Sequence, residues 1–341
     1  MSSSKTILVT GGAGYVGSVL TRKLVEQNFN VKIIDFLVYG DTGISKYLSD
    51  NSIEFLNADI REIGKIKDFF NGVDCVIHLA AVVGEPLCKK IPLAAKQINE
   101  FATKNLINLT KHIGVKRFVF ASTCSNYGST STIVNENSIV YPLSLYSECK
   151  VNSEKFLTSM NSKLFETCIL RFATAHGLSP RMRFDLLLQE FLHDALIDKK
   201  ISIFGEDFWR PLIHVDDMAD ACISVINAPS DLISGEIFNV GSDSENYTKK
   251  QLAKIIQEFI QDAEIEILKA KTDPRNYNVS FKKIKTTLNF TTKKSVEDSI
   301  DEILKEVKSG NLNPRDFNFT NMSKLTEKIR PLNNYQFDEN L

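Results

Sequence analysis

Two side chains capable of acid–base chemistry stand four positions apart in the segment Tyr146-Ser-Glu-Cys-Lys150. Positions i and i+4 of a helix project to one face, so the phenol and the ammonium group are neighbours if this segment is helical. A positive charge beside a phenol stabilises the phenolate and lowers the pKa of the tyrosine toward the working pH. Such a phenolate can remove a hydroxyl proton while hydride leaves the carbon that bears the hydroxyl. Thr123, at the end of an apolar run in FASTCSNYG, is placed to hold the same hydroxyl.

A glycine-rich turn near the N-terminus, KTILVTGGAGYVG, has the chemistry needed to bind a dinucleotide. Gly11 permits a tight turn, Gly14 lets the backbone approach a pyrophosphate, and Gly17 lets the following helix pack on the strand. The spacing is G-x-x-G-x-x-G, which differs from the standard G-x-G-x-x-G fingerprint. Asp35 ends the next apolar run, where a carboxylate can accept hydrogen bonds from the adenosine ribose and would repel a 2′-phosphate. The pattern therefore favours NAD over NADP.

Two more strand ends carry residues that suit a cofactor. Asp59 and Ile60, in NADIR, follow a third candidate strand and suit a contact with adenine. The run HLAA (78–81) ends another strand with the small residues needed where a cofactor crosses the strand tips.

The elements that must position these residues alternate regularly in the first half of the chain. Apolar strands separated by helices predict an α/β fold, a doubly wound parallel sheet covered on both faces, with ligands at the carboxyl ends of its strands. The expected strands are TILVT (6–10), VKIID (31–35), CVIHLAA (75–81), RFVFAS (117–122) and TCILRF (167–172), and the clearest helices are 18–28, 93–113 and 146–160.

The regularity ends near residue 174, which predicts a second, smaller lobe interleaved with the first. The runs PLIHV and EIFNVG are expected to return to the main sheet as strands, and the polar, Asn-rich C-terminal stretch is expected to be a surface tail. We predict a Rossmann domain at 1–174 and 212–244, a substrate lobe at 175–211 and 245–310, and a tail at 311–341.

Composition excludes several other classes of protein. The formal net charge of −1 offers no basic field for nucleic acid or an anionic membrane. No apolar run approaches the roughly 20 residues of a spanning helix, and the N-terminus lacks the features of a signal peptide. Six dispersed cysteines without a C-x-x-C pair, and five dispersed histidines, indicate reduced thiols and no metal site. We expect a cytoplasmic protein.

The chain resembles the extended short-chain dehydrogenase/reductase family, in particular its NAD-dependent nucleotide-sugar epimerases and dehydratases. The resemblance covers nearly the whole chain and is carried by TGGAGYVG, Asp35, HLAA, Asn99, Thr123, Tyr146 with Lys150, LRFATAHG, RPLIHVDDMADA and DPRNYNVSFKKI. It implies that Tyr146 is the base, Lys150 its electrostatic partner and Thr123 a ligand of the substrate hydroxyl. It also implies that Arg210 and Arg275 hold the diphosphate of a nucleotide-sugar, since two guanidinium groups can clamp a pyrophosphate. Family members commonly form homodimers through the helices expected at 93–113 and 146–160.

The resemblance and the residue patterns together give two sets of expected binding residues. Those for the cofactor NAD are Gly11, Gly14, Tyr15, Val16, Gly17, Asp35, Asp59, Ile60, Leu79, Ala80, Ala81, Asn99, Tyr146 and Lys150. Those for the nucleotide-sugar are Thr123, Thr174, Arg181, Arg183, Arg210 and Arg275.

The sequence departs from the family pattern beside Thr123. Sugar 4,6-dehydratases carry an Asp-Glu pair there, whereas this chain has Cys124 and Ser125, which argues against dehydration. Thr174 stands where relatives often carry Asn, and His176 where they often carry Tyr. A thiol and an imidazole serve as an acid–base pair in 3,5-epimerase/reductases of the wider family, so Cys124 with His176 is an alternative acid–base pair.

These observations favour an NAD-dependent nucleotide-sugar epimerase that transiently oxidises a hydroxyl, at C4. A C4 dehydrogenase or reductase that releases a keto sugar would need the same residues and stays open. A 3,5-epimerase/reductase that uses Cys124 and a non-catalytic nucleotide sensor are the further alternatives.

Overall fold

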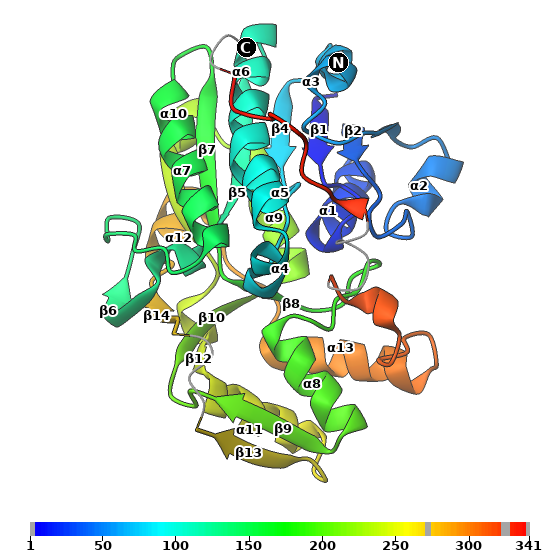
Figure 1. The fold of residues 1–341 in the computed structure, drawn as a ribbon, viewed down its shortest axis with the longest axis vertical. Helices are drawn as coiled ribbons and strands as arrows, with labels where there is room; N and C mark the ends of the chain where they lie inside the picture. The colour runs from blue at the N-terminus through cyan, green and yellow to red at the C-terminus, as the bar shows by residue number, and fades with distance from the viewer. Residues whose placement is uncertain (1–3, 270–273, 322–327, 339–341) are drawn as a thin grey trace.

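A parallel sheet of seven strands forms the centre of the larger lobe (Figure 1). The computed structural model describes residues 4–269, 274–321 and 328–338 of the 341-residue chain. Neighbouring strands follow the order β11-β7-β5-β4-β1-β2-β3, and the paired strands are parallel throughout. The strands are β1 (Thr6–Thr10), β2 (Asn30–Asp35), β3 (Glu54–Asn57), β4 (Cys75–His78), β5 (Arg117–Thr123), β7 (Glu166–Phe172) and β11 (Glu236–Val240). The doubly wound Rossmann sheet predicted from the sequence is confirmed.

Helices cover both faces of this sheet because alternate side chains of each strand enter two separate apolar cores. In β1, Ile7 and Val9 pack in the core that contains α1 and α9, whereas Leu8 packs in the core that contains α6 and α7. Burial on both faces explains the nearly continuous apolar runs of the strands. The four helices are α1 (Tyr15–Glu26), α6 (Thr103–Ile113), α7 (Leu145–Met160) and α9 (Val215–Asn227).

The expected helix at 93–113 is interrupted in the structure. It consists of α5 (Pro92–Lys96), a π-helical stretch (Gln97–Ala102) and α6. The shorter helices around the sheet are α2 (Ser45–Ser49), α3 (Ile63–Ile66), α4 (Glu85–Lys90), α10 (Ser230–Ile233) and α12 (Lys282–Leu288).

The strand order places a switch point between β1 and β4. From β1 the chain proceeds outward to β3, and from β4 it proceeds to the opposite edge at β11. Ligands of doubly wound sheets bind in the crevice at the carboxyl ends of the strands at such a point.

The prediction that PLIHV returns to the main sheet is wrong. These residues belong to β10 (Trp209–His214), which pairs with β8 (Thr174–His176) and β12 (Asn246–Thr248) in a separate three-stranded sheet. The main sheet has no place for β10 next to β7, because β5 and β11 already pair with the two sides of β7. EIFNVG does join the main sheet, as β11.

The smaller lobe lies below the carboxyl ends of the sheet in Figure 1. It is built around β9 and β13, a parallel pair, with α8 packed against β9 and α11. A further parallel pair joins β6 to β14. No helix in the described part of the chain is long and apolar enough to cross a membrane. The elements named here are β6 (Ser129–Val134), α8 (Leu187–Ile197), β9 (Lys200–Phe204), α11 (Lys249–Phe259), β13 (Glu264–Leu268), β14 (Asn276–Val279) and α13 (Val296–Lys308).

The C-terminal segment runs back across the larger lobe, as the red trace in Figure 1 shows. Ile329 is buried, and Arg61 donates a hydrogen bond of 2.8 Å to the carbonyl oxygen of Arg330. The side-chain amide of Gln97 bonds both the backbone nitrogen and the carbonyl oxygen of Leu332, at 2.8 and 2.7 Å. This part of the predicted tail therefore lies on the surface but is tied to the larger lobe by specific contacts.

Candidate active site

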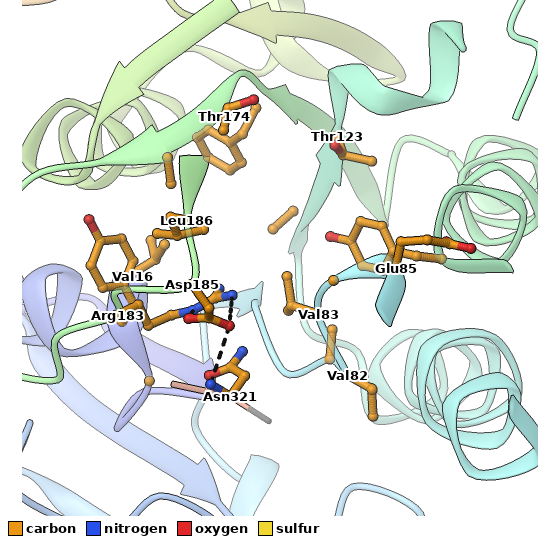
Figure 2. A pocket seen from close by; sticks show the side chains of 18 of the residues that line it. Val16, Val82, Val83, Glu85, Thr123, Thr174, Arg183, Asp185, Leu186 and Asn321 are labelled. Atoms are coloured by element: carbon orange, nitrogen blue, oxygen red, sulfur yellow. Dashed lines mark hydrogen bonds and ion pairs between the residues drawn. The ribbon is translucent and has the colours of Figure 1, made fainter. Parts of the chain in front are cut away.

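A cavity of about 1000 Å³ opens at the carboxyl ends of the sheet and extends into the smaller lobe. Its wall contains every residue predicted to bind a cofactor or substrate except Asn99. The sheet supplies the end of β5, the glycine turn and the tips of β2 and β4, while the smaller lobe supplies the opposite wall. Figure 2 shows Thr123 and Thr174 on strands at one end of the cavity, with Arg183 and Asp185 across from Val83.

The glycine turn is packed too closely for side chains at two positions. Gly11 has a φ of 77°, and a Cβ there would lie 2.8 Å from the backbone nitrogen of Ala80. A Cβ on Gly17 would lie 2.1 Å from the carbonyl oxygen of Gly11. No side chain caps the N-terminus of α1, where Gly14 is the N-cap residue and lines the cavity. The first turn of α1 can therefore offer its backbone N–H groups to an anion.

Asp35 is fixed at the tip of β2 by two backbone donors. Its carboxylate accepts hydrogen bonds from the backbone nitrogens of Ala13 at 3.0 Å and Leu37 at 2.8 Å. Burial raises the pKa of this carboxyl. The two donors hold the Asp35 carboxylate at the cavity wall, and its remaining lone pairs can accept hydrogen bonds from ribose hydroxyls.

Asp59 and Asn99, two further residues predicted to bind the cofactor, have different surroundings. Asp59 lines the cavity, but its carboxylate forms an ion pair with Arg61, at 2.6 Å between Oδ2 and NH2. Asn99 is buried behind the wall, where it bonds both the nitrogen and the oxygen of Val82 at 2.8 Å. Asn99 therefore holds the loop after β4 in place, and Val82 is the residue that lines the cavity.

Helix α7 presents Tyr146 and Lys150 to the same wall as Thr123. The helix begins at Ser144, which forms a capping box with Ser147. Lys150 is 3% exposed, and its ammonium group donates a 2.6 Å hydrogen bond to the carbonyl oxygen of Ala121 and lies 5.8 Å from the centre of the Tyr146 ring. The predicted helical pairing of phenol and ammonium is thus present in the geometry.

The pKa values of Tyr146 and Lys150 differ from those expected for a phenol and an ammonium group that affect only each other. Burial raises the pKa of Tyr146, and neighbouring Arg183 and Arg275 lower it by less. Burial also lowers the pKa of Lys150, to about 8. The lowered tyrosine pKa predicted from the sequence is absent here, because desolvation of the ring outweighs the neighbouring cations.

Arg210 and Arg275 approach each other from separate segments. Arg210 is buried, and one guanidinium nitrogen donates to the carbonyl oxygens of Trp209, at 2.8 Å, and Arg275. The guanidinium carbon lies 5.5 Å from the centre of the Tyr277 ring. Since both arginines line the cavity, their side chains can converge on one anionic group.

Arg181 and Arg183 have unlike partners. Arg183 forms a two-bond ion pair with Asp185, with both N–O distances at 2.9 Å. Figure 2 shows Asp185 between Arg183 and Asn321, whose backbone nitrogen donates to the same carboxylate at 3.2 Å. Arg181 instead stacks on the Tyr39 ring, at 3.9 Å from guanidinium carbon to ring centre.

Cys124 and His176 lie outside the cavity wall. The Cys124 thiol is buried and donates to the carbonyl oxygen of Arg171 at 3.1 Å, and burial raises its pKa. His176 is fully buried, its Nδ1 bonded to the Ser299 hydroxyl at 2.6 Å, and burial holds its pKa well below the usual range.

Comparison with known proteins decides the family. A model of the NAD dependent epimerase/dehydratase family matches residues 7–241. The chain belongs to this family. It is an enzyme, and NAD is its cofactor.

Relatives within the NAD dependent epimerase/dehydratase family differ in activity. The UDP-glucose 4-epimerase of Halalkalibacterium halodurans is 30% identical over 311 residues, 84% of this chain and 90% of that protein. UDP-glucuronic acid decarboxylase 1 of Xenopus tropicalis is 25% identical over 313 residues, 88% of this chain and 71% of that protein. A crystal structure of UDP-glucuronic acid 4-epimerase from Bacillus cereus, in complex with UDP-glucuronic acid and NAD, matches with a TM-score of 0.80 at 25% identity. That match covers 89% of this chain and 99% of the other.

The cavity fits the cofactor that the family binds. The uncapped start of α1 and the close backbone contact at Gly11 suit a diphosphate, and the fixed carboxylate of Asp35 suits ribose hydroxyls. Thr123, Tyr146 and Lys150 line the same cavity at the carboxyl end of β5.

Several cavity residues were not predicted from the sequence. Tyr39 and Glu85 follow the ends of β2 and β4, and Asn321 and Ile329 come from the predicted tail. Their position after strand tips could have suggested Tyr39 and Glu85. No local pattern points to Asn321 or Ile329, because only the return of the C-terminal segment brings them to the cavity.

Proposed function

We propose that this enzyme is an NAD-dependent nucleotide-sugar epimerase that transiently oxidises a sugar hydroxyl, at C4. The observation that carries the proposal is one cavity lined by Thr123, Tyr146 and Lys150 and also by Arg210 and Arg275. The first three residues provide the groups for oxidation of a hydroxyl, and the two arginines provide a place for a second diphosphate. Relatives named for UDP-sugars support this substrate class.

The nucleotide-sugar is held by its diphosphate at Arg210 and Arg275. Their side chains come from β10 and from the segment before β14, and Arg210 is bonded to the backbone of Arg275. Charge-assisted hydrogen bonds from two guanidinium groups fix both the position and the orientation of a diphosphate. The sugar then extends toward Thr123 and Tyr146.

Tyr146 acts as the base that removes the proton of the sugar hydroxyl. The pKa of Lys150 is about 8, so at lower pH its ammonium group keeps a positive charge beside the phenol. Thr123, in the same cavity wall, orients the sugar hydroxyl by hydrogen bonding. Bound NAD supplies the acceptor and donor of hydride. After the keto sugar has turned in the cavity, hydride returned to its other face would invert the carbon, and Tyr146 gives the proton back to the oxygen.

The surroundings of Thr123 argue against dehydration. Cys124 is buried and does not line the cavity. Ser125 does line the cavity, and its hydroxyl is hydrogen-bonded to the Thr123 hydroxyl at 2.9 Å. Neither residue supplies the carboxyl pair that dehydratases carry in these positions. The 3,5-epimerase alternative also has no support, since Cys124 and His176 do not line the cavity.

A panel of UDP-, GDP-, dTDP- and CDP-sugars tests the proposal. We expect a sugar with inverted C4 by NMR, without net NADH absorbance. Accumulating NADH with a keto sugar would instead identify a C4 dehydrogenase that uses the same residues. No turnover of any nucleotide-sugar would contradict the proposal.

A further inference from the structure

Two buried polar groups without hydrogen-bond partners meet at one end of the cavity. Among the described residues, the hydroxyl of Tyr39 and one terminal nitrogen of Arg181 have no partner. The guanidinium carbon of Arg181 lies over the ring of Tyr39, 3.9 Å from its centre, and both residues line the cavity. A buried donor left without an acceptor is costly, so this end of the cavity is built for a ligand with several acceptor oxygens.

Within the described ranges, Arg181 also has no carboxylate partner. It is 6% exposed, and no ion pair joins it to an acid in the described part of the chain, whereas its neighbour Arg183 is paired with Asp185. Burial and the adjacent charge of Arg183 lower the pKa of Arg181 to about 10, so the group stays charged at neutral pH. Because an unpaired buried charge is costly, the Arg181 guanidinium group would be stabilised by an anionic ligand.

Hydrogen bonds tie the segment that carries Arg181 to the first turn of α1. The Tyr15 hydroxyl donates to the carbonyl oxygen of Gly177 at 2.6 Å, and the Ser179 hydroxyl donates to the carbonyl oxygen of Tyr15 at 2.7 Å. The hydroxyls of Ser18 and Ser179 are also bonded, at 3.1 Å. Arg181 therefore lies between the start of α1, where a dinucleotide diphosphate binds, and the loop after β2.

The position of Arg181 relative to Asp35 argues against the other anionic groups of the cofactor and the substrate as the ligand of Arg181. Asp35 acts on the charge of Arg181, and Tyr39 follows it in the same loop. A 2′-phosphate at this point would be repelled by the Asp35 carboxylate. The substrate diphosphate has its own arginine pair, Arg210 and Arg275.

We propose that Arg181 and Tyr39 bind the diphosphate of NAD, with the guanidinium group as its counter-ion and the phenol as a second donor. Arg181 is then a cofactor residue contributed by the smaller lobe, in place of the substrate role predicted from the sequence. This inference rests on the NAD cofactor of the family and holds whichever sugar reaction the enzyme performs.

Binding measurements on the purified enzyme stripped of cofactor test the assignment. Isothermal titration of Arg181→Met with NAD and with ADP-ribose should show both dissociation constants raised about 10- to 100-fold, the loss expected for charge-assisted bonds. Adenosine, which lacks the diphosphate, should bind the variant and the parent equally. Tyr39→Phe keeps the stacked ring and should weaken NAD about two- to tenfold.

The matched control is Arg210→Met, which should weaken UDP and GDP while leaving the dissociation constant of NAD within twofold. Melting temperatures without ligand check that each variant folds, and Tyr39→Phe carries the test if Arg181→Met does not fold. Unchanged NAD binding in folded Arg181→Met and in Tyr39→Phe would overturn the proposal. A larger loss for UDP than for NAD, or for NADP than for NAD, would also overturn it.

Discussion

Lys150 is buried where its positive charge costs stability. The residue is 3% exposed, and its ammonium group is bonded to the carbonyl oxygen of Ala121 and lies 4.5 Å from the centre of the Phe120 ring. No acid forms an ion pair with it in the described part of the chain. The lowered pKa, about 8, measures the cost of burying this charge. A group maintained at such a cost beside Tyr146 is consistent with a role in proton transfer.

Lys150→Met should change how stability depends on pH. The pKa of Lys150 is about 8 in the folded enzyme, below its ordinary value of 10.5, so the unfolded chain binds more protons between these values. The free energy of unfolding of the parent therefore rises with pH from about 8 to 10.5, by up to about 3 kcal/mol from this group. The variant lacks this rise.

Urea unfolding at a series of pH values measures the difference. The stability of Lys150→Met relative to the parent should be greatest near neutral pH and fall as the pH approaches 10.5. A difference that does not vary with pH would mean that Lys150 titrates normally in the folded protein.

Tyr146→Phe should lower turnover by about 10²–10⁴, the usual range for loss of a general base. The variant keeps the ring, so the dissociation constant of NAD and the melting temperature should stay close to those of the parent. Steady-state kinetics with the nucleotide-sugar found in the panel measures the effect. Turnover within tenfold of the parent would remove Tyr146 from the mechanism.

The sequence predicts the positions of the proposed catalytic residues better than it predicts their surroundings. Tyr146 and Lys150 are four positions apart on one helix, and Thr123 ends a strand, so local patterns suffice to place them. The contact of Arg181 with Tyr39 joins segments far apart in the chain, and nothing in either segment indicates it. The same reason hides the raised pKa of Tyr146, which follows from burial in the assembled cavity.

At the scale of elements, the turn between β1 and α1 depends on backbone contact. Gly17→Ala would place a Cβ 2.1 Å from the carbonyl oxygen of Gly11 and 2.7 Å from the Cα of Gly12, so the turn must move. We expect destabilisation of at least about 1–3 kcal/mol and a large loss of NAD affinity. Denaturant unfolding and NAD titration measure the two effects.

Gly64→Ala is the matched control, because Gly64 lies in α3 and a Cβ there meets nothing within 4 Å. This change should be neutral or stabilise by about 0.5–1 kcal/mol, with NAD binding unchanged. Equal effects of the two substitutions would contradict the role given to the turn.

The inner strands β1, β4, β5 and β7 were predictable because burial on both faces gives each a nearly continuous apolar run. The run PLIHV has the same character, and its local sequence could not show that β7 is already paired on both sides. The interruption of the 93–113 helix by a π-helical stretch was likewise hidden, since its residues keep helical character. Pairing partners and helix irregularities depend on the assembled fold.

In the molecule as a whole, the C-terminal segment stabilises the larger lobe through hydrogen bonds to buried side chains. It satisfies the buried side chains of Arg61, Gln97 and Asn105 and adds Ile329 to the cavity wall. Ending the chain at Asn321 would leave these three side chains without those partners, at about 1–3 kcal/mol for each group that stays buried. The melting temperature should fall, and Gln97→Ala should reproduce part of the loss. A truncated enzyme as stable as the full chain would show that the segment only rests on the surface.

The homodimer expected through α5–α6 and α7 stays a prediction. In the monomer, residues of the C-terminal segment lie on these helices, with the Phe337 ring 5.1 Å from that of Phe156 and Asn105 bonded to the backbone of Asp338. Light scattering of the full chain should give the mass of two chains. A single-chain mass at micromolar concentration would contradict a stable dimer.

We propose that hydride leaves and returns to the same sugar carbon within one cavity that also holds the sugar diphosphate. The most direct test is turnover of the accepted nucleotide-sugar in deuterium oxide, followed by NMR of the product. We expect a product with inverted C4 and no solvent deuterium on any ring carbon. Deuterium at C3 or C5, or a keto sugar released with stoichiometric NADH, would contradict it.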